Sequence, residues 1–237
     1  MKKSLLTTAL LLALSAPAYA QSVTTTSAPA ASTSQQTTLE EQIKYLQDEW
    51  ARIKYQVPEK NDQLNALHKL EDHASKVSAG YPERAEPKIW EAIILSTEAG
   101  VVKGMGALPK VEKAKTLLEK AEKIDTRALE GSAHTSLGSL YYQVPGWPIG
   151  FGDDDLAEQH LKMALQMNPT GIDPNFFYGD FLLQDNRFEE AKTYLERALQ
   201  APDRPGRALA DAGRRQEIKA ALAKIGEKKK TEGQSFN

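Results

Sequence analysis

The chain has 237 residues, of which 41% are hydrophobic and 26% charged, as in an ordinary soluble protein of one or two domains. Its 30 basic and 32 acidic residues give a formal net charge of −2. This balance argues against a dedicated nucleic-acid-binding protein, because such proteins usually carry a basic excess. The chain has no cysteine, which excludes disulfide scaffolds, thiolate metal sites and thiol catalysis.

Residues 1–20 have the pattern of a secretory signal peptide. Lys2 and Lys3 precede an apolar run from Leu5 to Ala16, and Ala18 and Ala20 form a small-x-small cleavage site. The apolar run of about 12 residues is shorter than the roughly 20 that a membrane-spanning helix needs. We expect cleavage after Ala20, a periplasmic location and no stable membrane anchor after cleavage.

Residues 21–37 are mainly Ser, Thr, Ala and Gln, with no charge. Such a segment buries too little apolar surface to offset the entropy of ordering it. We predict a disordered linker, which acts either as a spacer or simply as the end of the mature chain.

From Thr38 onward the apolar residues recur with a helical period, and no convincing alternating stretch predicts a strand. The first stripe covers 39–53 and ends before Pro58, and the second covers 64–77 and ends at Gly80. Further helices are predicted from Pro87, from Pro109, from a cap at Asp125 to Tyr142, and over 154–167, 174–184, 187–200 and 207–226. The predicted fold class is therefore all-α.

A 34-residue period relates two of these helices. The spacing small-x3-large-x2-small occurs at Ala157, Leu161 and Ala164 and recurs 34 residues later at Ala191, Leu195 and Ala198. The preceding helices share a second pattern, which is Leu137, Gly138 and Tyr141 in one unit and Tyr178, Gly179 and Leu182 in the next. Together these patterns resemble the tetratricopeptide repeat family.

The resemblance is clearest over 126–203 and implies a helical repeat domain over 38–226. It implies a right-handed α-solenoid of about four antiparallel helix pairs, in which small residues let the helices approach closely. The helix from 207 is predicted to cap the solenoid, with Arg214 mostly outward. Residues 227–237 are predicted to form a solvated basic and polar tail.

One unit departs from the family spacing. Tyr141 and Ala157 are 16 residues apart, where the family has 9, so an insertion lies within 143–155. The insertion contains Trp147 and Phe151. Two interpretations stay open: an aromatic flap over the binding groove, or a loop whose aromatic side chains fold back as a plug.

The family binds partners on the concave surface formed by the first helix of each unit. Carried over by position, the lining residues are Ser132, Thr135, Ser139 and Tyr142, then Asp173, Phe176, Asp180 and Leu183. The lysines and asparagines that clamp a peptide carboxylate in the family's best-known groove are absent from these positions. The surface suits a neutral or basic extended peptide, an apolar segment or a glycan.

No catalytic constellation is found, and neither a cofactor nor a metal site is predicted. His134 and His160 can approach each other, although lone helical histidines are more often packing or surface residues. Asp153, Asp154 and Asp155 could hold Ca²⁺, but a helix N-cap with first-turn acids explains them better. The arginines near 204–215 are expected to pair with local acids such as Asp203 and Asp211.

The predicted function is a non-enzymatic periplasmic adaptor that binds an envelope protein or peptide. The alternative is an accessory component of a periplasmic solute transport system that binds a small apolar ligand. Nucleic acid is not an expected partner.

Overall fold

A computed structural model describes residues 38–234, with side chains up to residue 228. The predicted signal peptide and linker (1–37), and the side chains of 229–237 in the predicted tail, lie outside this part. Within it the chain forms nine α-helices and two short 3₁₀ turns, η1 (Gly104–Ala107) and η2 (Ala128–Gly131). The α-helices are α1 (Leu39–Gln56), α2 (Lys60–Gly80), α3 (Ala85–Val102), α4 (Leu108–Ile124), α5 (Ser132–Gln143), α6 (Asp154–Met167), α7 (Ile172–Gln184), α8 (Phe188–Leu199) and α9 (Ala208–Gln234).

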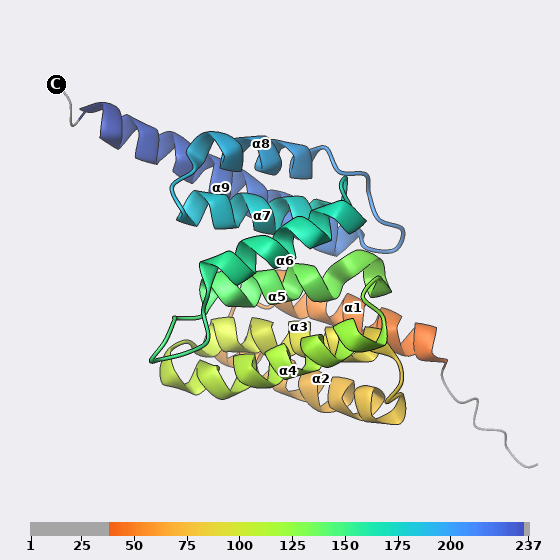
Figure 1. The fold of residues 1–237 in the computed structure, drawn as a ribbon. Coiled ribbons are helices and arrows are strands. Elements are labelled where there is room, and N and C mark those ends of the chain that lie inside the picture. Colours follow the sequence, from red (N-terminus) through yellow and green to blue (C-terminus); the bar gives the residue numbers. More distant parts are fainter. Residues whose placement is uncertain (1–37, 235–237) are drawn as a thin grey trace, which may run out of the picture. The chain divides into compact units, whose positions relative to one another are not determined.

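The predicted all-α helical repeat is confirmed for these residues. Successive helices pack as the pairs α1–α2, α3–α4, α5–α6 and α7–α8, and the pairs stack in chain order (Figure 1). The last helix, α9, packs against α7 and α8 and also contacts α1. Ala210 of α9 accordingly belongs to the same hydrophobic cluster as Leu46 and Trp50. The first and last helices of the described chain therefore share a core.

Helix starts follow local chemistry. Thr38 caps α1 through a capping box, in which its hydroxyl accepts from the amide of Glu41 at 3.2 Å and Glu41 accepts from the amide of Thr38 at 2.8 Å. Asp153 caps α6 by accepting from the amide of Leu156 at 2.9 Å. Asp154 and Asp155 stand in the first turn of α6. The geometry matches the N-cap interpretation of this acidic cluster.

The small residues of the repeat are where two helices touch. Ala157, Ala164, Ala191 and Ala198 are all fully buried. A Cβ atom at Gly138 would lie 2.6 Å from Cγ of Leu161, and one at Gly179 would lie 2.8 Å from Cγ of Leu195. Each glycine therefore leaves room for the leucine of the second helix in the same pair.

Substituting Gly179 with alanine should destabilise the fold. The added Cβ would meet both the side chain of Leu195 and its backbone nitrogen, at 3.2 Å. Overpacking of this kind costs about 1–3 kcal/mol, which exceeds the roughly 1 kcal/mol that alanine gains over glycine in a helix. Urea unfolding curves of Gly179→Ala should show the loss.

The matched control is Gly226→Ala in α9, where a Cβ meets nothing within 4 Å. This variant should be unchanged or more stable by up to about 1 kcal/mol. Equal stability of the two variants would contradict the close-packing role of Gly179.

Two predicted helix boundaries are wrong. The helix expected from Asp125 begins only at Ser132, because Leu129, Glu130 and Gly131 adopt left-handed backbone angles with φ of 49°, 57° and 79°. The helix expected to end at 226 continues to Gln234. None of the helices within 38–234 combines the length and apolar character required to cross a membrane.

Candidate functional site

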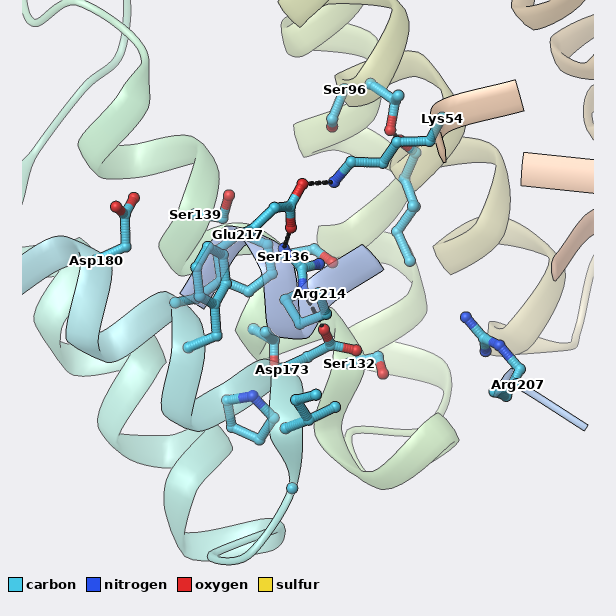
Figure 2. A pocket seen from close by; sticks show the side chains of 18 of the residues that line it. Lys54, Ser96, Ser132, Ser136, Ser139, Asp173, Asp180, Arg207, Arg214 and Glu217 are labelled. Atoms are coloured by element: carbon cyan, nitrogen blue, oxygen red, sulfur yellow. Dashed lines mark hydrogen bonds and ion pairs between the residues drawn. The ribbon is translucent and has the colours of Figure 1, made fainter. Parts of the chain in front are cut away.

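A groove of about 1400 Å³ runs along the first helices of three successive pairs. Side chains of α3, α5 and α7 form one wall, and α1, α9 and the 202–207 loop contribute much of the remaining lining. Figure 2 shows Ser96 of α3, three serines of α5 and Asp173 and Asp180 of α7 around the same space as Lys54 of α1 and Glu217 of α9. Residues far apart in the sequence thus meet in one surface.

Helix α5 presents a row of hydroxyl groups to the groove. Ser132, Ser136 and Ser139 are spaced by four and three residues, which places them on one helix face beside Thr135. The Ser132 hydroxyl donates to the carbonyl of Leu129 at 2.6 Å, and that of Ser139 accepts from Gln143 at 3.0 Å. The Ser136 hydroxyl makes no hydrogen bond to another described residue, and is free to bind a ligand.

Aromatic side chains from the helices on either side of α5 also line the groove. Trp50 and Trp90 pack edge to face with ring centroids 5.8 Å apart, and the Trp50 indole donates to the Thr97 hydroxyl at 2.8 Å. Phe176 and Phe177 of α7 also face the groove, with ring centroids 5.1 Å apart. These rings offer apolar contact area next to the polar row.

An ion network joins α7 to α9. The guanidinium of Arg214 donates to Asp173 at 2.8 Å and to Glu217 at 2.6 Å, and it lies 4.4 Å from the ring centroid of Phe176. Arg204 donates to Asp173 at 2.6 Å. Burial raises the pKa of Asp173, but the two arginines outweigh it and hold that pKa well below its usual range. Asp173 is therefore ionised at any physiological pH.

The network extends to α1. The Lys54 ammonium lies 2.9 Å from Glu217, and burial together with the nearby Arg214 charge lowers the pKa of Lys54 to about 8. On the other side, Arg204 donates to the buried carboxylate of Asp211 at 2.7 Å. Most charged side chains of the groove thus satisfy one another.

Arg207 differs from the other groove cations. Its guanidinium lies 5.1 Å from the ring centroid of Trp90, and it makes no ion pair with any residue of 38–228. Burial and the neighbouring Arg204 charge lower its pKa. Figure 2 shows Arg207 apart from the dashed contacts of the Arg214 network. Arg207 therefore offers the groove a cation without a direct ion-pair partner among the described side chains.

The repeat pattern is confirmed by a family model. Residues 149–225 match the model described as tetratricopeptide repeat. Residues 149–225 therefore carry the tetratricopeptide repeat pattern. Such repeats indicate a protein–protein interaction scaffold, and proteins built from them are generally non-catalytic.

Among solved structures, the chain is similar to one whose description reads "Functional Characterization of Pseudomonas Aeruginosa pilF". The two are 17% identical, with a TM-score of 0.33 and coverage of 80% of this chain and 91% of the other. No curated protein matches the chain.

The structure brings together most of the residues predicted for the tetratricopeptide repeat groove. Five of the predicted binding residues line it: Ser132, Thr135, Ser139, Phe176 and Asp180. Asp173, predicted for the same surface, lines it as well. The other four do not line it: Trp147, Phe151, Tyr142 and Leu183. The Tyr142 hydroxyl donates to Asp180 at 2.8 Å, and Leu183 lies in the core. Both side chains support the wall of the groove from behind.

Of the two interpretations of the insertion, the structure matches the plug for Phe151 and places neither aromatic side chain over the groove. Phe151 packs edge to face on Tyr141, with centroids 5.8 Å apart, and Lys115 of α4 lies over both rings. A Cβ at Gly150 would be 3.5 Å from Leu108, which also belongs to α4. Phe151 therefore folds back as the second interpretation expected, whereas Trp147 is 90% exposed and lies outside the groove lining.

Sequence reasoning missed the contribution of α1 and α9. Trp50 falls within the apolar stripe predicted over 39–53, and Arg214 was expected to face mostly outward although it is 5% exposed. Arg204 and Arg215 pair with Asp211 and Asp203 as predicted, whereas Arg207 makes no ion pair with a described side chain. The residues of α1 and α9 join the groove only because the two ends of the helical stack meet.

Proposed function

We propose that this chain is exported to the periplasm and acts there as a non-enzymatic adaptor, which binds an extended segment of an envelope protein in its groove. The observation that carries the proposal is the row of α5 hydroxyls between two aromatic clusters. An extended segment has unpaired backbone N–H and C=O groups, and a hydroxyl can both donate to and accept from them.

The size and charge of the groove support a peptide. Its volume of about 1400 Å³ exceeds the roughly 300–1000 Å³ of ordinary small-molecule sites. Because its acids and bases are mostly paired with one another, a highly charged segment would find few free partners. Arg207 is the exception. The best fit is therefore a segment that is uncharged apart from one carboxylate, which would pair with Arg207 beside the Trp90 ring.

The decisive experiment blocks the groove with a bulky side chain. Ser136→Phe places a large side chain among the α5 hydroxyls and should reduce capture of the envelope partner by at least tenfold. Thr116→Phe makes the same kind of change at an exposed position of α4 and should leave capture unchanged. Both variants are first checked by circular dichroism, so that loss of fold is not mistaken for loss of binding.

The same purified protein also tests whether the chain is exported and which segment of the partner it binds. Protein recovered from the periplasm should begin at Gln21. Synthetic peptides from the captured partner should compete for binding to the wild type but show no binding to Ser136→Phe. Equal capture by both phenylalanine variants would contradict binding in the groove.

A second candidate is the accessory component of a periplasmic solute transport system. It is favoured by the apolar contact area that Trp50, Trp90 and Phe176 present to the groove. This function expects a small apolar molecule in the native mass spectrum of freshly purified protein. If the spectrum shows no such molecule and the synthetic peptides compete for binding, the result supports the adaptor over the transport component.

A further inference from the structure

Three side chains outside the groove converge from three helices. Glu122 lies on α4, His134 on α5 and His160 on α6. The Nδ1 atoms of the two histidines are 2.9 Å apart, and the Glu122 carboxylate is 3.6 Å from Nδ1 of His134. One ligand atom of each residue lies within 4.8 Å of the other two. The cluster links one repeat to the next.

We propose that Glu122, His134 and His160 bind a divalent transition-metal ion of the Zn²⁺ type. A tetrahedral Zn²⁺ ion holds nitrogen and oxygen ligands at about 2.0–2.2 Å, which places neighbouring ligand atoms roughly 3.3–3.5 Å apart. The distances of 2.9 and 3.6 Å lie on either side of this spacing. The third pair, His160 and Glu122, has ligand atoms within 4.8 Å of each other. Side-chain adjustment would therefore complete three corners, and water would supply the fourth.

The surroundings orient the histidines for this role. Thr126 Oγ1 lies 2.9 Å from Nε2 of His134, so it can accept that N–H and leave the Nδ1 lone pair for the metal. The Tyr141 ring stacks on His160, with centroids 5.6 Å apart and an interplanar angle of 14°. His134 is 2% exposed, which limits its ring to this one arrangement.

The local charge also favours a cation. Lys115 lies near the cluster, but it pairs with Glu119. No lysine or arginine in the described chain pairs with Glu122, whose one ion-pair partner there is His134. The Glu122 carboxylate is therefore available to neutralise part of a metal charge. Two imidazoles and one carboxylate suit Zn²⁺ or its neighbours better than Ca²⁺ or Mg²⁺, which take oxygen ligands.

The test is calorimetric titration of ZnCl₂ into untagged full-length mature protein that has been stripped with chelator. We expect one saturable site per chain and a rise in melting temperature with Zn²⁺. His160→Gln and, separately, Glu122→Gln should each weaken Zn²⁺ binding at least tenfold. Both residues are partly exposed, so these variants are expected to fold, which circular dichroism checks.

The matched control removes the two other histidines of the chain. His68 and His73 lie on α2, so the double variant His68→Gln, His73→Gln should bind Zn²⁺ as the wild type does. Co²⁺ bound to the wild type should show the intense visible absorption of a tetrahedral site, which His160→Gln should lack. The absence of a saturable site, or unchanged affinity in folded His160→Gln, would overturn the proposal.

Discussion

Replacing Leu195 with alanine is expected to lower the free energy of unfolding by about 2–5 kcal/mol. Leu195 is fully buried, and its branched end lies against Gly179, where no other side chain can fill the space. The substitution therefore leaves a cavity between α7 and α8. Denaturant unfolding followed by circular dichroism measures the loss.

The control for this prediction is Leu156→Ala at the start of α6. Leu156 is 37% exposed, so its truncation should change stability by no more than about 0.5 kcal/mol. Its hydrogen bond to Asp153 uses the backbone amide and survives the substitution. A comparable loss in both variants would mean that Leu195 does not fill a repeat core.

A double-mutant cycle tests the contact itself. Because the Cβ at position 179 would collide with the Leu195 side chain, Gly179→Ala should cost less in the Leu195→Ala background than in the wild type. Strict additivity would argue that the two positions do not touch.

Replacing Arg214 with alanine should also destabilise the protein strongly, by about 3 kcal/mol. Removing one partner of a buried ion pair typically costs 3–5 kcal/mol, because the remaining charge is left without compensation. The lower end applies here, since Asp173 keeps Arg204 and Glu217 keeps Lys54. The variant also loses the stacking of the guanidinium on Phe176.

Arg52→Ala is the matched surface control. Arg52 makes two hydrogen bonds to Glu49, at 2.9 and 2.6 Å, but its side chain is 47% exposed. Solvent screening limits such a pair to roughly 0.5 kcal/mol. If thermal and denaturant unfolding gave equal losses for the two arginine variants, the network between α7 and α9 would not stabilise the fold.

Replacing Arg214 with alanine should also change how the free energy of unfolding depends on pH. Because the pKa of Asp173 is depressed in the folded protein, the unfolded state takes up the proton first as pH falls through the usual aspartate value of 3.8. The stability due to Asp173 is thus present above that pH and lost below it. In Arg214→Ala the pKa moves back toward 3.8, so the acid-dependent loss should be smaller than in the wild type.

The repeat core was predictable because its signals are local. Ala157, Leu161 and their copies 34 residues later specify a helix face, and Gly138 and Gly179 specify where a second helix approaches. Five of the predicted groove residues follow from the same register, since α5 and α7 turn one face to the core and the opposite face to the groove. The start of α5 was not predictable, because the residue types at Leu129 and Glu130 do not indicate left-handed backbone angles.

The sequence by itself therefore determined the class of the fold, the positions of most helices and the inward faces of the two clearest repeats. Only the tertiary structure decided that α9 returns to α1, that Arg214 is buried on Asp173, and that Glu122 lies beside His134 and His160. The physical reason is that a periodic pattern fixes which side of a helix is apolar, whereas contacts between distant helices depend on the small rotations that accumulate from one helix pair to the next.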